Sequence, residues 1–337
     1  MEQRVLGKTG RAASIVGLGT WQLGADWGSV TESDALAVLD AAVESGVTFL
    51  DTADVYGDGR SEQIIGRYLA DTSARGIVVA TKMGRRAEQV PENYTLPNFR
   101  AWTDRSRANL GVDRLDLVQL HCPPTPVYYS DAVYDALDTL VAEERIAAYG
   151  VSVETCEQAL AAIAHPAVAT VQIIFNAFRR KPLDQVLPAA AAAGVGIIVR
   201  VPLASGLLSG RYTVDTVFAA DDHRNYNRHG EAFDVGETFS GVDYPTGVQA
   251  AGEFAAIARE PGAFATAPGQ PVTTAQAALR WVTQQPGVTT VIPGARNPAQ
   301  ARQNAAAADL PPLSEQALGE IGELYDKYFR AEIHSRW

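Results

Sequence analysis

Short runs of apolar residues alternate along most of the chain with longer segments in which apolar residues recur every three or four positions. The short runs are typical of strands buried on both faces, and the longer segments are typical of amphipathic helices. Their regular alternation predicts repeated β-α-β units around a parallel sheet. The predicted strands are 15–19, 48–51, 77–81, 115–120, 147–151, 170–174, 196–201 and 289–292.

A segment of helical periodicity comes after each predicted strand, which makes eight strand and helix pairs. Eight pairs favour a closed TIM (β/α)8 barrel over an open doubly wound sheet. Thr31 stands where an N-cap is expected before the first helix. The predicted helices are 32–44, 61–69, 98–110, 131–143, 155–163, 184–193, 274–284 and 298–308.

Three segments lie outside this pattern. Residues 4–14, with a turn at 7–10, predict an N-terminal β-hairpin, and residues 314–328 predict an extra C-terminal helix. The interval 204–271, between the seventh strand and its helix, is long and rich in Asp, His, Asn, Gly and Pro. Because the loops after the strands form the catalytic face of a TIM barrel, we expect this insertion to cover the active-site face. A decorative or disordered insertion is the alternative, and in either case we predict one barrel domain over 1–337.

The composition, with 47% hydrophobic and 20% charged residues, is that of a globular protein. A net charge of −11 argues against nucleic acid or an anionic membrane as a partner. No run of 18 apolar residues and no signal-peptide pattern occurs, and Cys122 and Cys156 make no CxxC or Cys/His metal spacing. We therefore expect a cytoplasmic protein with two free thiols.

Common cofactor and hydrolase motifs are incomplete in this chain. Gly17-Leu18-Gly19 begins like the dinucleotide fingerprint, but Gln22 replaces its third glycine. Gly7-Lys8-Thr9 resembles the end of a phosphate-binding P-loop, but Glu2 stands where the first glycine is required. The chain has no Gly-x-Ser-x-Gly elbow and no HExxH spacing, so we expect neither a serine hydrolase nor a metal site.

Polar residues at the ends of buried strands form the candidate catalytic group. Asp51, Lys82 and His121 close the second, third and fourth strands, and Tyr56 lies in the loop after Asp51. Each taken singly is also explained as a cap, a solvated strand end or loop packing, but a barrel brings all four to one face.

These four residue types suit carbonyl reduction. The carbonyl oxygen needs a proton donor, and a tyrosine with its ordinary pKa of about 10 is a weak acid at neutral pH. Lys82 would lower that pKa, Asp51 would keep Lys82 ionised, and His121 would donate a hydrogen bond to the substrate oxygen.

The segment DTADVYG at 51–57, followed by Ser61-Glu62 and Gly66, is similar to the signature of the aldo-keto reductases. GLGTW at 17–21 and Leu120-His121 also resemble this family, and the resemblance runs over essentially the whole chain. It implies a TIM-barrel enzyme that moves hydride between nicotinamide and an aldehyde or ketone, or performs the reverse alcohol oxidation. The family's catalytic tetrad maps onto Asp51, Tyr56, Lys82 and His121.

The resemblance also implies NADP(H), bound extended at the C-terminal face of the barrel without a Rossmann domain. Residues matching Ser152 and Gln172 would hold the nicotinamide amide, with Asn176 nearby. Members of the family often have Ser-Asn in the fifth strand, whereas Val153 follows Ser152 here, so one usual amide contact is replaced.

Arg200 occupies the seventh-strand region where the family commonly places an aromatic residue against the nicotinamide ring. Its planar guanidinium can stack on the ring instead, and the alternative is a pair with a barrel carboxylate such as Asp51. We expect the pyrophosphate near 203–211. The remaining residues assigned to this part of the cofactor site are Gly19, Thr20, Trp21, Asp51, Val201, Pro202, Leu203, Ser205, Gly206, Leu208, Ser209 and Arg211.

The segment 292–304 is similar to the family's adenosine-binding end. Gly294 and Ala295 would lie at the start of the eighth helix, where unpaired N–H groups favour phosphate. Arg296 would bind the 2′-phosphate, which is the reason to expect NADP rather than NAD, and a solvated arginine is the alternative. Gln300 and Asn304 lie on one helical face and would reach the adenine.

We expect the substrate to contact Trp21, Trp27, Tyr56 and His121. Further aromatic residues in predicted loops favour an apolar mouth suited to a hydrophobic carbonyl compound, although such residues also serve as lids of the core. These aromatic residues are Tyr94, Trp102, Tyr226, Phe233 and Phe239.

Two other functions fit the same fold. Some relatives are nucleotide-binding regulatory or sensor subunits with little turnover, but this chain has no tail or heptad that favours a protein partner. A lyase or isomerase on the same barrel would need neither Arg296 nor a tyrosine beside Lys82. Tight NADPH binding would therefore argue against the lyase or isomerase.

Overall fold

Eight parallel strands form a closed barrel within residues 1–24, 30–73 and 75–337, which the computed structural model describes. The ring closes because Val291 donates its N–H to Ile15 at 3.0 Å and accepts the N–H of Gly17 at 2.8 Å. The predicted TIM barrel is confirmed. The strands are β3 (Leu18–Gly19), β4 (Phe49–Asp51), β5 (Val78–Met83), β6 (Leu117–His121), β7 (Tyr149–Ser152), β8 (Thr170–Ile174), β9 (Gly196–Arg200) and β10 (Val288–Val291).

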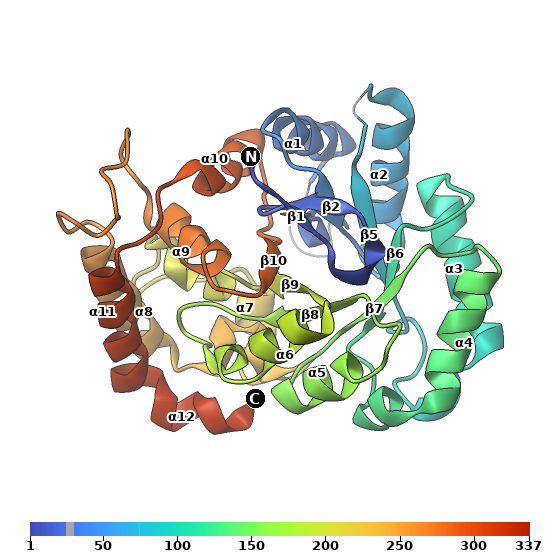
Figure 1. The fold of residues 1–337 in the computed structure, drawn as a ribbon. Coiled ribbons are helices and arrows are strands. Elements are labelled where there is room, and N and C mark those ends of the chain that lie inside the picture. The colour runs from blue at the N-terminus through green and yellow to red at the C-terminus, as the bar shows by residue number, and fades with distance from the viewer. Residues whose placement is uncertain (25–29, 74) are drawn as a thin grey trace.

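Helices surround this barrel, and α10 lies beside α1 where the ring of helices closes (Figure 1). The predicted Thr31 cap is present, since its hydroxyl accepts the N–H of Asp34 at 3.1 Å. No helix of the described residues is both long and apolar enough to span a bilayer. The barrel helices are α1 (Glu32–Glu44), α2 (Arg60–Asp71), α3 (Leu96–Leu110), α4 (Asp131–Ala142), α5 (Cys156–Ile163), α6 (Val186–Ala193), α9 (Thr274–Thr283) and α10 (Pro298–Ala306).

The N-terminal hairpin consists of β1 (Gln3–Val5) and β2 (Ala12–Ser14), paired antiparallel as predicted. Leu6 next to it is fully buried and belongs to a separate core cluster with Phe49, Leu117 and Ile198 from three barrel strands. The hairpin therefore closes the barrel at the end opposite the strand carboxyl termini.

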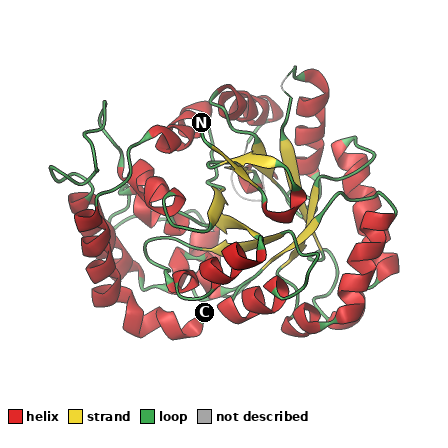
Figure 2. Cartoon of the chain, viewed as in Figure 1, coloured by secondary structure: helices red, strands yellow, loops and turns green. Residues whose placement is uncertain are grey.

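The insertion 204–271 differs from the predicted loop because it contains helices. The longer one, α8 (Tyr244–Ile257), packs beside α11 (Glu315–Tyr325), and a short one, α7 (His223–Tyr226), precedes it (Figures 1 and 2). Asp243 caps α8 by accepting the N–H of Thr246 at 3.1 Å, and the apolar face of α8 buries Phe254. Tertiary packing, which periodicity alone does not reveal, makes this segment helical.

Several predicted boundaries were wrong by a few residues. The first strand is regular only at Leu18–Gly19, because residues 15–17 serve the barrel closure. Thr155 and Ser314 are caps outside α5 and α11, and α11 ends at Tyr325, where a π-helical turn continues to Arg330 before α12 (Ala331–Ile333).

Candidate active site

The barrel brings the four candidate catalytic residues to one end of the strands. Asp51, Lys82 and His121 lie at the C-terminal ends of β4, β5 and β6, and Tyr56 lies in the turn that follows β4. Adjacent parallel strands bring these ends together because their registers match Asp51 with Ala80 and Lys82 with Gln119. Asp51 and Lys82 are almost completely buried.

Lys82 is held by three oxygen atoms. Its Nζ donates to Oδ1 of Asp51 at 2.5 Å, to the carbonyl of Thr52 at 2.9 Å and to the hydroxyl of Tyr56 at 3.4 Å. The second oxygen of Asp51 accepts the Nε2 of Gln172 at 2.8 Å and that of Gln119 at 3.2 Å. Burial acts to lower the pKa of Lys82, but the charges and hydrogen bonds of Asp51 and Tyr56 together outweigh it, so the pKa is raised and Lys82 stays an ammonium.

Burial raises the pKa of Tyr56 above its ordinary value, and the adjacent Lys82 offsets only part of this. Lys82 does act to lower the pKa of Tyr56, as expected. Burial raises that pKa by more, so the expected net lowering is wrong. The reason is that burial strips water from a phenolate, which makes the charged form costly. The tyrosine therefore keeps its proton at neutral pH and has one to donate.

The ring of His121 meets that of Tyr56 edge to face, with 6.0 Å between the ring centroids. Burial and the positive charges of Arg85 and Lys82 hold the pKa of His121 well below its usual range. The imidazole is therefore neutral, and it can donate one hydrogen bond without carrying a charge.

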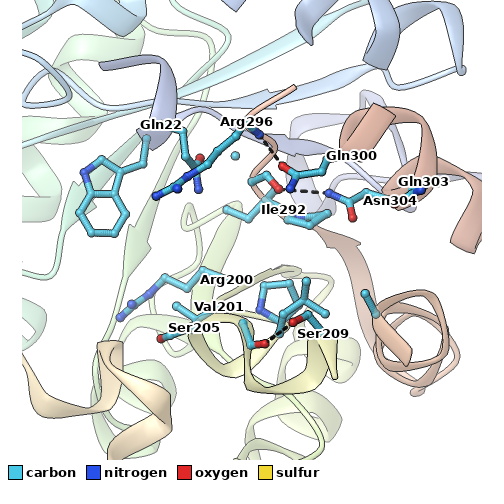
Figure 3. A pocket seen from close by; sticks show the side chains of 18 of the residues that line it. Gln22, Arg200, Val201, Ser205, Ser209, Ile292, Arg296, Gln300, Gln303 and Asn304 are labelled. Carbon is cyan, nitrogen blue, oxygen red and sulfur yellow. Dashed lines mark hydrogen bonds between the residues drawn. The ribbon is translucent and has the colours of Figure 1, made fainter. Parts of the chain in front are cut away.

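A cavity of about 770 Å³ begins at Asp51 and Tyr56 and extends between two walls of the barrel mouth. Figure 3 shows Arg200, Ser205 and Ser209 on one wall, and Arg296 and Asn304 on the opposite wall. The predicted cofactor residues that line this cavity are Gly19, Thr20, Trp21, Asp51, Gln172, Arg200, Val201, Pro202, Leu203, Ser205, Gly206, Ser209, Arg211, Gly294, Arg296, Gln300 and Asn304.

Several predicted contacts are not among the residues that line this cavity, and these include His121 and Ala295. Leu208 is fully buried in the main core cluster and does not line the cavity, because its side chain packs inward from the wall. Ser152 is buried, and its hydroxyl accepts the Sγ of Cys122 at 3.4 Å. Asn176 donates to the carbonyl of Val201 and the hydroxyl of Ser240, so it ties the insertion to the end of β9. Trp27 lies outside the described residues.

Arg200 pairs with two glutamates, not with Asp51. Its Nη2 lies 2.9 Å from Oε2 of Glu154, after β7, and its Nη1 lies 2.9 Å from Oε1 of Glu237, in the insertion. The alternative that Arg200 pairs with a carboxylate is therefore right, but Asp51, the partner given as its example, is wrong because Gln119, Gln172 and Lys82 already surround that carboxylate.

The segment 292–304, expected to bind the adenosine end of the cofactor, also differs from the prediction. The helix α10 begins at Pro298 with Asn297 as its cap, so Gly294 and Ala295 lie in the turn before it and not at its first residues. Gln300 accepts the backbone N–H of Arg296 at 2.8 Å, and Asn304 donates to the carbonyl of Gly294 at 3.1 Å (Figure 3). These amides shape the turn that presents Arg296 to the cavity.

The predicted apolar mouth is wrong for three of its aromatic residues. Tyr94 and Trp102 pack against Phe99 and each other, and Phe239 is fully buried. These three side chains belong to, or pack against, the hydrophobic core and do not line the cavity. Trp21 does line the cavity, with Phe233 edge-on to it at 6.2 Å between ring centroids.

Several residues of the cavity wall were not predicted. Glu237, His223 and Arg224 come from the insertion, whose fold carries no periodic signal. The turn at 273–275 was detectable in principle, because Thr273 caps α9 in a capping box with Gln276. The other missed residues are Gln22, Tyr212, Arg259, Val272 and Gln303.

Comparison with known proteins decides the family. The family model described as "Aldo/keto reductase family" matches residues 15–326. This chain belongs to the aldo/keto reductase family. As a member, it is an oxidoreductase of that family, and the resemblance of the 51–57 segment is confirmed.

Relatives of this aldo/keto reductase cover nearly its whole length. The aldo-keto reductase YhdN of Bacillus subtilis is 29% identical over 89% of this chain and 86% of its own. The structure of the glycerol dehydrogenase of Gluconobacter oxydans has a TM-score of 0.77 with 27% identity, and covers 97% of this chain and 95% of that one. An aldo-keto reductase of Klebsiella pneumoniae in complex with NADPH has a TM-score of 0.69 with 25% identity, and 96% of each chain is covered.

Proposed function

We propose that this oxidoreductase transfers hydride between NADP(H) and an aldehyde or ketone, or catalyses the reverse oxidation of an alcohol. The observation that carries the proposal is the hydroxyl of Tyr56, 3.4 Å from a buried Lys82 that Asp51 holds ionised, at the wall of a long cavity. A metal-free carbonyl reduction needs this combination of a proton donor and a fixed positive charge.

Tyr56 acts as the general acid, giving its proton to the carbonyl oxygen as negative charge develops there. Lys82 stabilises the tyrosinate that remains. Asp51 keeps Lys82 charged and holds its ammonium group next to the Tyr56 hydroxyl. The neutral His121 donates a hydrogen bond to the same oxygen and so orients the carbonyl. In the oxidative direction, the tyrosinate takes the proton back as the general base.

The cavity residues fit NADP(H). Gln172 lies beside Asp51 in the cavity wall, where its amide would hold the carboxamide of the nicotinamide, and Arg200 would contact the ring. At the other end Arg211 and Arg296 would bind the phosphates, Arg296 taking the 2′-phosphate. When bound, NADPH supplies the hydride. The related Klebsiella pneumoniae reductase in complex with NADPH supports this assignment.

A fluorescence titration of the purified protein with NADPH and NADH tests the cofactor, and absorbance at 340 nm with a panel of aldehydes and ketones tests the reaction. We expect tight binding that favours NADPH, together with turnover. Binding without turnover on any carbonyl compound would favour a nucleotide-binding regulatory subunit. If neither nucleotide binds, the proposed function is wrong.

A further inference from the structure

Two arginines and two glutamates form a charged cluster, here called the Arg–Glu cluster, at the wall of the candidate active site. Arg200 lies between the carboxylates, with its Nη2 2.9 Å from Oε2 of Glu154 and its Nη1 2.9 Å from Oε1 of Glu237. Nη2 of Arg85 lies 3.2 Å from Oε1 of Glu154 and 3.9 Å from Oε1 of Glu237. The hydroxyl of Ser205 donates to the carbonyl of Glu237 at 2.8 Å, which ties the insertion to the loop after β9. The four side chains together carry no net charge.

The Arg–Glu cluster adjoins the groups that would bind the substrate oxygen. Nε of Arg85 donates to the carbonyl of His121 at 3.2 Å, and the charges of Arg85 and Arg200 both act to lower the pKa of His121. Glu237 lines the same cavity as Tyr56, and its charge acts to raise the pKa of Tyr56. Hydride transfer requires the nicotinamide ring about 3 to 3.5 Å from the carbonyl carbon. Because that carbonyl would be held by Tyr56 and His121, the ring would lie next to the cluster.

Other charged groups near the cluster are paired as well. Lys82 forms an ion pair with Asp51. The buried Arg179 donates its Nη2 to the carbonyl of Glu154 at 2.5 Å, and the charge of Asp234 acts on it in the opposite sense to burial. Each of these positive side chains thus has a negative counterpart. Removing one member would leave a net charge in a site with little water, where charges act more strongly than in bulk solvent.

Carbonyl reduction moves a hydride from the nicotinamide ring to the carbonyl carbon and a proton from Tyr56 to the carbonyl oxygen, so the ring changes from neutral to singly positive. A guanidinium beside that ring would repel its oxidised form. We propose that Glu154 and Glu237 cancel this repulsion and, acting through Arg200, are positioning residues that set how tightly the site binds NADP⁺ relative to NADPH. This inference rests on the proposed reductase function.

The test measures Kd for NADP⁺ and NADPH by isothermal titration calorimetry at one ionic strength, in the wild type, Glu237→Gln, Glu154→Gln and Arg85→Gln. The two nucleotides differ only in the nicotinamide ring, so contacts with the phosphates cancel in the ratio of the two Kd values. A unit charge about 8 to 10 Å from the ring changes a binding constant by roughly 15- to 30-fold at an effective dielectric constant of about 20. We expect the ratio of Kd for NADP⁺ to Kd for NADPH to rise by about 5- to 30-fold in each glutamate variant and to fall by a similar factor in Arg85→Gln.

The double variant Glu237→Gln with Arg85→Gln restores the balance of charge. Its ratio should return toward the wild-type value, because opposite charge changes cancel whereas structural damage from two substitutions adds up. Arg200 stays charged in all of these variants, since a guanidinium does not lose its proton in a protein. Glu231→Gln is the matched control, because it makes the same change at an exposed position of the insertion and should leave the ratio unchanged.

Two outcomes would overturn the inference: an unchanged ratio in the glutamate variants, or a shift in Arg85→Gln in the same direction as theirs. If one glutamate variant does not fold, the other glutamate variant decides together with Arg85→Gln. If the wild type binds neither nucleotide, the proposed reductase function is wrong as well, so the two failures are distinguishable.

Discussion

Lys82 and Asp51 show how single residues can carry charge inside a barrel. Both are almost completely buried, and removing either partner would leave the other charge unpaired in a medium where that costs several kcal/mol. Gln119 and Gln172 donate to the carboxylate of Asp51, which satisfies the oxygen that Lys82 does not use. Lys82 and Asp51 therefore form a preorganised ion pair beside Tyr56.

Tyr56→Phe removes one hydroxyl, whose only hydrogen bond within the described residues is to Lys82. We expect kcat to fall by about 10²- to 10⁴-fold, the usual contribution of a general acid, with NADPH affinity unchanged. Steady-state kinetics and a fluorescence titration measure the two quantities. Tyr149→Phe is the control, because it removes a hydroxyl from a buried tyrosine that bonds Asp138 on the outer side of the barrel. A loss of cofactor binding in Tyr56→Phe would contradict the assigned role.

Asp54, two residues before Tyr56, is a buried carboxyl without a well-aligned donor among the described residues. Burial and the charge of Glu62 raise the pKa of Asp54 from 3.8 to about 7, with Arg105 offsetting part of the shift. Because the folded state binds this proton more tightly than the unfolded chain, stability is lost as pH rises from about 4 to about 7. Asp54→Asn removes this loss. The free energy of unfolding of Asp54→Asn, minus that of the wild type, should therefore rise by about 2 kcal/mol between pH 5.5 and pH 8.5. Urea unfolding at both values measures it, and a pH-independent difference would refute the argument.

At the scale of elements, local signals in the sequence explain where helices begin, and packing explains what they cover. Thr31, Thr155 and Thr273 each cap a barrel helix through a backbone N–H. The hairpin is different, because its place depends on contacts with distant strands. Gly7 has φ of +51°, and a Cβ there would lie 2.1 Å from the carbonyl of Ala169 and 2.3 Å from the N of Gly196. Glycine at position 7 therefore lets the hairpin pack closely against the N-terminal ends of β8 and β9.

Gly7→Ala should therefore destabilise the protein by more than about 3 kcal/mol, since backbone atoms cannot yield as a flexible side chain does. Gly10→Ala is the matched control. Gly10 also has positive φ, +68°, but a Cβ there meets nothing within 4 Å, so only about 1 kcal/mol of backbone strain is expected. Equal shifts of the urea midpoint in the two variants would show that the close contact does not contribute.

At the scale of the whole molecule, the cavity joins parts of the chain that are far apart in sequence. Trp21 follows the first barrel strand, Arg200 ends the seventh, Glu237 belongs to the insertion, and Arg296 follows the last strand. A ligand that bridges these segments stabilises all of them at once, because unfolding any of them releases it.

NADPH at about 100 times its Kd should add about 2.7 kcal/mol to the free energy of unfolding, seen as a rise in Tm. Loss of a charge-assisted phosphate contact in Arg296→Ala, worth about 1.5 to 3 kcal/mol, should reduce this gain by about 1.4 to 2.4 kcal/mol for NADPH at the same concentration and leave the smaller effect of NADH unchanged. Arg302→Ala is the control, because Arg302 lies on α10, just after the turn that holds Arg296, but pairs with Glu44 on α1. If Arg296→Ala weakens both nucleotides equally, Arg296 does not contact the 2′-phosphate.

The sequence by itself determined the barrel, its hairpin, the order of its strands and helices, and the positions of Asp51, Tyr56, Lys82 and His121 at strand ends. These features are local, since a period of 2 or 3.6 residues and a polar residue after an apolar run can be seen in one stretch of chain. Only the tertiary structure decided which charges meet: Arg200 with Glu154 and Glu237, the isolation of Asp54, and the burial that raises the pKa of Tyr56. Ion pairs and desolvation depend on distances between residues far apart in sequence, which exist only once the chain has folded.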